Sequence, residues 1–168
     1  MCSKLPDPAA ALLTLEEAVS WRKSLALDGK RLAVTNGCFD IMHRGHAEYL
    51  SRARNCADAL LVLLNSDASV SSLKGPTRPL VSQDDRAFLL NSLRAVDRVV
   101  IFDSSRCDKE LAALFPDVYV KAGDYTLEKL DPGEREALLN AGTEIVFMPF
   151  VEGLSTSSLV EKIIRTSK

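Results

Sequence analysis

Residues 31–53 read RLAVTNGCFDIMHRGHAEYLSRA and join three local signals without a gap. Residues 31–35 have the apolar character of a strand, a glycine-bearing turn follows, and residues 47–53 have the pattern of a helix. The chain has two histidines, and both of them, His43 and His46, lie in this stretch. A helix that starts after such a turn presents unpaired N–H groups and the positive end of its dipole. This arrangement predicts a phosphate-binding turn.

The rest of the chain alternates strand and helix signals. Apolar runs predict five strands, at residues 31–35, 59–64, 98–102, 118–120 and 144–148. Helix signals lie between and around them, at residues 14–28, 45–56, 82–94, 109–115, 132–140 and 155–165. This alternation predicts an α/β fold, a Rossmann-like three-layer sandwich with a five-stranded parallel sheet and right-handed crossovers. Ligands of such sheets bind beyond the carboxyl ends of the strands.

Length and composition favour one compact domain. The chain has 168 residues, of which 46% are hydrophobic, and this is enough for a single core. We expect residues 1–13 to be a flexible lead-in and residues 14–168 to form the domain. Residues 71–79, which are polar and include two prolines, are expected to be a loop.

Charge and cysteine content narrow the functional classes. The formal net charge is −2 and no basic stripe is visible, so no nucleic-acid partner is expected. Four cysteines without a C-x-x-C pair, together with two histidines, predict no protein-bound metal site. The longest apolar run, residues 59–64, is too short for a membrane span, and no secretory signal is present. We therefore expect a cytoplasmic protein with reduced thiols and no membrane partner.

Residues 36–46 resemble the G-x-F-D-x-x-H-x-G-H signature of the cytidylyltransferase-like nucleotidyltransferases. Six positions match in register: Gly37, Phe39, Asp40, His43, Gly45 and His46. The resemblance extends over about residues 31–166 and implies a nucleotidyltransferase-type fold. The alternative is that the two histidines are ordinary surface residues at a helix cap.

The resemblance implies roles for individual side chains. Two histidines and a lysine, His43, His46 and Lys74, would be catalytic and contact the triphosphate. The nucleotide-binding set would be Gly37, Cys38, Phe39, Gly45, Arg86, Gly123, Asp124, Ser155, Thr156 and Ser157. The acceptor would meet Asp40, Lys74 and Lys121. The sequence leaves open whether the imidazoles act in their neutral or their protonated form.

Several of these residues have a simpler structural alternative. Asp40 could cap a turn, Lys74 could be a solvated lysine in the polar loop, and Arg86 could pair with a neighbouring acidic residue. Ser155 could be a helix N-cap, although four consecutive hydroxyl residues after a glycine favour phosphate binding. Ala122 replaces a glycine of the family's V-K-G-G-D-Y segment, which could narrow the site.

Four segments resemble the heptose-phosphate adenylyltransferase branch of this family: residues 65–70, 73–79, 120–125 and 149–156. The implied reaction joins ATP and D-glycero-β-D-manno-heptose 1-phosphate to give ADP-heptose and pyrophosphate, for lipopolysaccharide or another surface glycan. Mg²⁺ would arrive with the triphosphate. In many bacteria this activity is half of a bifunctional protein that also carries a sugar kinase. The chain has no room for a kinase, so a separate heptose kinase is expected, and relatives imply a homodimer.

Two other functions remain open. Glycerol-3-phosphate cytidylyltransferase shares the histidine signature, but its usual R-T-E-G is replaced here by FVEG at residues 150–153. The second alternative is a nucleotide-binding module that does not catalyse a reaction.

Overall fold

The structure is a computed structural model that describes residues 7–149, residue 153 and residues 156–166. It has an α/β fold built on one parallel sheet, as the alternation of signals predicts. The sheet has six strands, so the prediction of five is wrong. The additional strand, β1 (Leu12–Leu13), pairs with β4 (Arg98–Phe102) at the sheet edge. A strand of two residues is too short to show a periodicity that sequence reading could detect.

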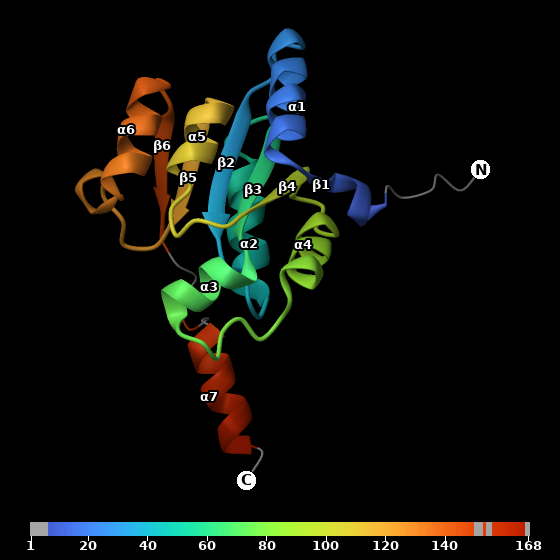
Figure 1. Cartoon of the computed structure of the whole chain (residues 1–168), viewed down its shortest axis with the longest axis vertical. Coiled ribbons are helices and arrows are strands. Elements are labelled where there is room, and N and C mark those ends of the chain that lie inside the picture. Colours follow the sequence, from blue (N-terminus) through green and yellow to red (C-terminus); the bar gives the residue numbers. More distant parts are fainter. Residues whose placement is uncertain (1–6, 150–152, 154–155, 167–168) are drawn as a thin grey trace.

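The strand order is β1-β4-β3-β2-β5-β6 (Figure 1). The remaining strands are β2 (Leu32–Gly37), β3 (Ala59–Asn65), β5 (Val118–Ala122) and β6 (Glu144–Met148). All seven residues of β3 are buried, which explains its unbroken apolar run. The chain builds the sheet outward on one side of β2 and then crosses to β5 on the other side. The crevice between β2 and β5 is therefore the topological switch point.

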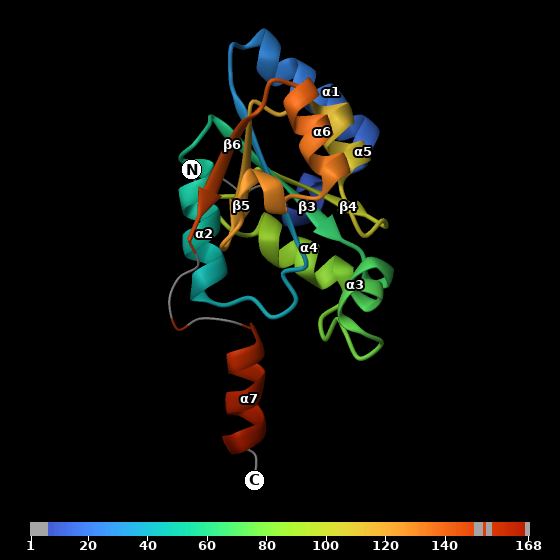
Figure 2. The same cartoon turned by 90° about the vertical axis from the view of Figure 1, so that its left-hand side faces the viewer.

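Helices cover both faces of the sheet (Figures 1 and 2). One face packs against α1 (Leu15–Leu27), α5 (Asp108–Leu114) and α6 (Pro132–Asn140), whose buried leucines join one core cluster. The other face packs against α2 (Arg44–Arg54) and α4 (Gln83–Asn91), which contribute to a second cluster. The protein therefore has three layers, with the sheet between two layers of helices.

The segment that follows β3 is helical. Residues Asp67–Lys74 form α3, because the Ser66 hydroxyl accepts a hydrogen bond from the Ser69 N–H at 3.2 Å and caps the first turn. The expectation of a loop over residues 71–79 is therefore wrong for its first four residues. The error arose because serines and a following Gly-Pro pair outweigh the helical pattern in the sequence.

The remaining elements are short or lie at the periphery. Two 3-10 turns, η1 (Pro8–Ala11) and η2 (Leu127–Lys129), flank the core. The last helix, α7 (Thr156–Thr166), extends away from the sheet at the end where β2 and β5 stop (Figures 1 and 2). Of the helices that the described residues form, none combines the length and the apolarity needed to cross a bilayer.

Candidate active site

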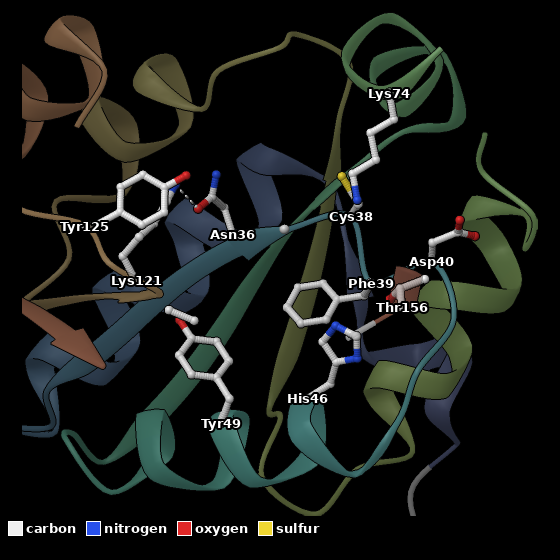
Figure 3. A pocket seen from close by; sticks show the side chains of 12 residues that line it. Asn36, Cys38, Phe39, Asp40, His46, Tyr49, Lys74, Lys121, Tyr125 and Thr156 are labelled. Atoms are coloured by element: carbon white, nitrogen blue, oxygen red, sulfur yellow. Dashed lines mark hydrogen bonds between the residues drawn. The ribbon is translucent and has the colours of Figure 1, made fainter. Parts of the chain in front are cut away.

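A pocket of about 330 Å³ lies at the carboxyl ends of β2 and β5 (Figure 3). Residues 36–40, which end β2 and follow it, line one part of this pocket, and Ala122 lines another. The other lining residues are His46, Tyr49, Lys74, Lys121, Tyr125 and Thr156. The pocket therefore occupies the switch point, where parallel α/β sheets bind their ligands.

The start of α2 presents two imidazoles. His43 is the N-cap residue, and its Nδ1 accepts a hydrogen bond from the Gly45 N–H at 3.1 Å. His46 reaches back, and its Nδ1 accepts from the His43 N–H at 3.3 Å. This is a capping box built from histidines. Because each Nδ1 is an acceptor, a neutral ring must carry its proton on Nε2, so each histidine keeps one N–H donor for a ligand.

The environment of His46 favours the neutral ring. Partial burial is the main cause that lowers its pKa, and the nearby His43 and Lys74 add to the effect, so the pKa falls from 6.5 to about 4. His46 lines the pocket and is therefore a neutral donor at neutral pH. The ring of His43 lies beside it, with centroids 4.0 Å apart, but His43 is not among the lining residues.

Phe39 holds the turn between β2 and α2 in an uncommon conformation. Its φ is +46°, a region that residues with side chains seldom occupy. Its buried ring packs on His46, with centroids 5.4 Å apart. A methyl group on Gly37 would lie 2.9 Å from the Phe39 ring, so the glycine of the signature leaves room for that ring. Strain of this kind clusters at functional sites.

Lys74 is the last residue of α3 and lines the pocket from the side opposite β5. Figure 3 shows its side chain directed towards Cys38. The lysine is exposed, so it can move its ammonium group over a bound anion. Cys38 is half-buried, and its thiol lies 3.8 Å from the Asn65 side-chain oxygen.

Asp40 lines the pocket but its carboxylate is fully engaged. It accepts hydrogen bonds from Arg78 at 2.7 Å, from the Leu80 N–H at 2.7 Å and from the Val81 N–H at 3.0 Å. Burial alone would raise the pKa of Asp40, but these donors together lower it. Asp40 thus fastens the segment before α4 to the signature loop, which is a structural role other than the turn cap that the sequence suggests.

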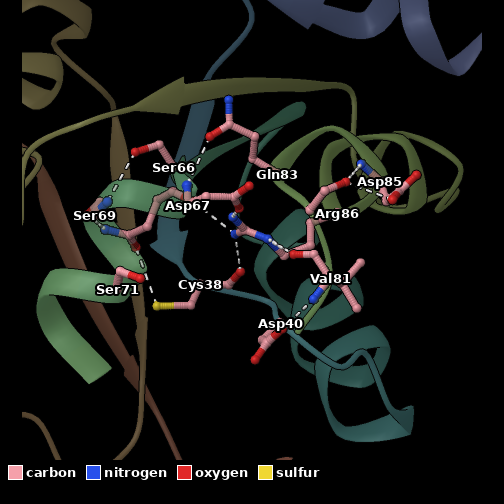
Figure 4. A network of polar contacts seen from close by, with 12 residues as sticks. Cys38, Asp40, Ser66, Asp67, Ser69, Ser71, Val81, Gln83, Asp85 and Arg86 are labelled. Atoms are coloured by element: carbon pink, nitrogen blue, oxygen red, sulfur yellow. Dashed lines mark hydrogen bonds and ion pairs between the residues drawn. The ribbon is translucent and has the colours of Figure 1, made fainter. Parts of the chain in front are cut away.

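Arg86 is completely buried and joins four segments (Figure 4). Its guanidinium donates to the carbonyl groups of Cys38, Asn65 and Val81, at 2.6, 2.8 and 3.0 Å. It also pairs with Asp67 at 2.7 Å. Arg86 is not among the described residues that line the pocket. Its partner is Asp67 of α3, and not the acidic residues beside it in the sequence.

The segment after β5 contains two residues that the sequence assigns to nucleotide binding, Gly123 and Asp124. Gly123 is buried, has φ of +119° and donates its N–H to the Met148 carbonyl at 2.8 Å. Asp124 is exposed and pairs with Lys129 at 3.2 Å. Neither of them is among the lining residues that the structure describes.

At the start of α7, Thr156 lines the pocket, and its hydroxyl donates to the Ile41 carbonyl at 3.4 Å. Gly45 lies inside the first turn of α2 and donates its N–H to His43. Ser155 lies outside the described residues, and Ser157 belongs to α7, although its side chain is outside the description.

The sequence of the pocket and its surroundings matches one family. The cytidylyltransferase-like family model matches residues 34–162, a range that contains every lining residue. The chain belongs to the cytidylyltransferase-like family.

Relatives of this cytidylyltransferase-like chain are longer proteins. The bifunctional protein HldE of Helicobacter pylori is 45% identical over 155 residues, which are 92% of this chain and 31% of that protein. HldE of Geotalea uraniireducens is 44% identical over 158 residues, which are 94% of this chain and 32% of that protein. The chain thus spans about a third of the length of the curated relatives it matches.

A solved structure shares the fold. The lipopolysaccharide core biosynthesis protein of Thermoplasma volcanium superposes with a TM-score of 0.57 at 24% identity. The match covers 73% of this chain and 98% of that one.

Two lining residues of this family member, Asn36 and Tyr49, carry no functional signal in its sequence, whereas Tyr125 ends the segment that resembles the family's V-K-G-G-D-Y. Tyr49 is buried and bonds to the Thr35 hydroxyl at 2.7 Å and the Val120 carbonyl at 2.9 Å, so it ties α2 to the sheet. Asn36 on β2 faces Lys121 on β5, and the ring of Tyr125 lies beside Lys121, with its centroid 5.2 Å from the ammonium (Figure 3). The pairing of β2 with β5 brings Asn36 to Lys121, and a local motif does not encode that pairing.

Proposed function

We propose that this chain transfers AMP from ATP to D-glycero-β-D-manno-heptose 1-phosphate, giving ADP-heptose and pyrophosphate. One observation carries the reaction type. A switch-point pocket has the neutral N–H donor of His46 at a helix start and the ammonium of Lys74 opposite it. Such a set neutralises phosphate charge without a general base. The choice of substrates rests on the four segments that resemble the heptose branch.

The chemistry needs position and charge more than proton transfer. An anionic oxygen of the acceptor phosphate attacks the α-phosphorus of ATP and forms the new P–O bond. The bond from the α-phosphorus to the oxygen bridging to the β-phosphorus breaks, and pyrophosphate leaves with that electron pair. In this proposal His46 and His43 donate to phosphate oxygens, while Lys74 follows the charge as it moves to pyrophosphate. Each donor of this type is worth about 3 kcal/mol.

The hydroxyl groups at the start of α7 complete the phosphate site in this proposal. Thr156 already lines the pocket, and Ser155 and Ser157 adjoin it in the sequence. A helix N-terminus that bears hydroxyls suits the β- and γ-phosphates. Lys121 and its neighbours, at the opposite side of the pocket, would meet the acceptor.

Mg²⁺ enters this proposal as part of the substrate. Within the described ranges, no group of three or more His, Cys, Asp or Glu side chains is gathered to hold a metal ion. The carboxylate of Asp40, which lies in the pocket, is occupied by Arg78 and two backbone N–H groups. This donor set fits a cation that arrives on ATP and keeps the triphosphate oxygens as most of its ligands.

The wider setting follows from the same substrates. Because ATP is the donor, we place the reaction in the cytoplasm, and we assign the catalytic domain to residues 14–168 together with β1 of the same sheet. A heptose kinase activity would supply the sugar phosphate in this proposal. We also propose a homodimer. The exposed apolar side chains Ile163 and Ile164 on the projecting α7 support an intermolecular contact.

The test is pyrophosphate release with Mg²⁺, with ATP and CTP each offered heptose 1-phosphate and glycerol 3-phosphate. Release with ATP and the heptose phosphate alone is the expected result. Release with CTP and glycerol 3-phosphate would move the chain to the cytidylyltransferase alternative. An absence of release in every pair, together with retained ATP binding, would favour the non-catalytic module.

A further inference from the structure

A buried polar network lies behind the acceptor side of the pocket. Tyr119 and Glu134 are 0% and 3% exposed, and they flank Lys121, whose side chain is 14% exposed. The Lys121 ammonium lies 2.8 Å from Asn36 Oδ1, 3.1 Å from the Tyr119 hydroxyl and 3.6 Å from a Glu134 carboxylate oxygen. The first two contacts are hydrogen bonds that the ammonium donates, and the third is an ion pair.

The carboxylate of Glu134 is held in turn by Cys107. The Cys107 N–H and its thiol each lie 3.3 Å from the second carboxylate oxygen. The buried carboxylate of Glu134 therefore balances the positive charge of the partly buried Lys121, and both groups are also hydrogen-bonded to other residues. This balance fixes the ammonium in one place.

The network determines which way the Asn36 amide points. Two donors converge on one atom of Asn36, the Tyr119 hydroxyl at 2.9 Å and the Lys121 ammonium at 2.8 Å. An ammonium has no acceptor, so that atom must be the amide oxygen. The amide nitrogen is consequently turned away from Lys121, as Figure 3 shows. Within the part of the chain that the structure describes, this nitrogen has no hydrogen-bond partner.

We infer that Asn36 is a substrate-binding residue whose amide N–H groups donate to an oxygen acceptor of the bound substrate. The inference rests on the proposed function for the identity of the ligands. Asn36 is half-buried and lines the pocket next to Gly37 and Cys38. Phosphate, ribose and sugar oxygens share the acceptor chemistry that it would recognise. Tyr119 acts as a positioning residue, and Lys121 also orients Asn36 through the hydrogen bond that it donates to Oδ1.

The discriminating variant is Asn36→Asp. Its carboxylate has the shape of the amide and still accepts from Tyr119 and Lys121, so the network and the thermal stability should persist. On the side that faces the pocket, the donating amide nitrogen is replaced by an accepting carboxylate oxygen. We expect affinity for one ligand to fall by about tenfold to a hundredfold, the range for a hydrogen bond to a charged group. The neutral variant Asn36→Ala should also lose affinity for the same ligand.

Calorimetry on the full chain separates the two sources of the oxygen. One arm titrates a non-hydrolysable ATP analogue with Mg²⁺, and the other titrates the heptose 1-phosphate, each at low and high ionic strength. A loss confined to either ligand and retained at high salt supports the inference and identifies the source. Unchanged affinity for both ligands in Asn36→Asp, or a loss that disappears at high salt, overturns it. Failure of the wild-type chain to bind either ligand would instead overturn the proposed function, and the inference with it.

Discussion

His46 divides its two ring nitrogens between structure and ligand. Nδ1 accepts the His43 N–H and completes the helix cap, while Nε2 keeps its proton for the pocket. The cap fixes the ring orientation, so the donor needs no rearrangement when phosphate charge develops. The two functions can be separated by measurement, because loss of the donor lowers turnover and loss of the cap lowers the free energy of unfolding.

Replacement of this ring tests its place in the reaction. We expect His46→Ala to lower kcat for pyrophosphate release by a hundredfold or more, because a preorganised donor is lost. The lost cap should reduce the free energy of unfolding by about 1 kcal/mol, with the fold retained. A folded variant with near wild-type turnover would contradict the role.

The pKa of His46 predicts how stability depends on pH. Its pKa is about 4 in the folded chain, against 6.5 for a histidine that is free of burial and of neighbouring charges. Above pH 6.5 the ring is neutral in both the folded and the unfolded chain, and its contribution to stability is complete. As the pH falls from 6.5 towards 4, the unfolded chain binds a proton that the folded chain does not, so stability is lost.

Denaturant titrations across that pH range, on wild type and His46→Gln, measure this effect. The carboxylates of the chain titrate in both proteins, so the difference between the two proteins isolates the contribution of His46. The free energy of unfolding should fall less steeply in the variant. Equal slopes would mean that the pKa of His46 is the same in the folded and the unfolded chain.

At the scale of elements, Arg86 joins α4 to the signature loop, the end of β3 and the start of α3. Lysine cannot reproduce a planar fork that donates in four directions. We expect Arg86→Lys to reduce the free energy of unfolding by about 3 kcal/mol, since buried partners lose their donors. Urea denaturation checks this value. Arg52→Lys on the exposed face of α2 is the matched control and should shift it by less than about 0.5 kcal/mol. Equal stability of both variants would show that Arg86 is not a fastening residue.

Elements with strong local patterns were predictable and elements without them were not. The buried run of β3 and the Thr14–Glu17 capping box at the start of α1 give clear signals. The two-residue β1 has no period, and α3 is a short helix rich in serine, a residue that competes for backbone hydrogen bonds.

At the scale of the whole molecule, part of the site follows from sequence and part follows from the topology. The loop after β2 is one continuous segment, so its motif identifies it. The Asn36–Lys121–Glu134 network joins residues that are 85 or more positions from Asn36, through the pairing of β2 with β5. No local pattern encodes that pairing, and Arg86 likewise looks like a ligand contact until its burial is known.

The exposed isoleucines of α7 predict a dimer. We expect sedimentation equilibrium to give twice the chain mass of 18.4 kDa, because α7 leaves Ile163 and Ile164 half-exposed. The paired change of both isoleucines to serine should shift the equilibrium to monomer. A wild-type chain that sediments as a monomer at every concentration would contradict the dimer.

In the proposed reaction the α-phosphorus of ATP, and not the γ-phosphorus, moves to the sugar phosphate. ATP labelled at one phosphorus or the other, incubated with Mg²⁺, heptose 1-phosphate and the purified chain, tests this directly. We expect α-label to appear in ADP-heptose and γ-label to appear only in pyrophosphate. Transfer of γ-label to the sugar, or retention of α-label in ADP, would contradict it.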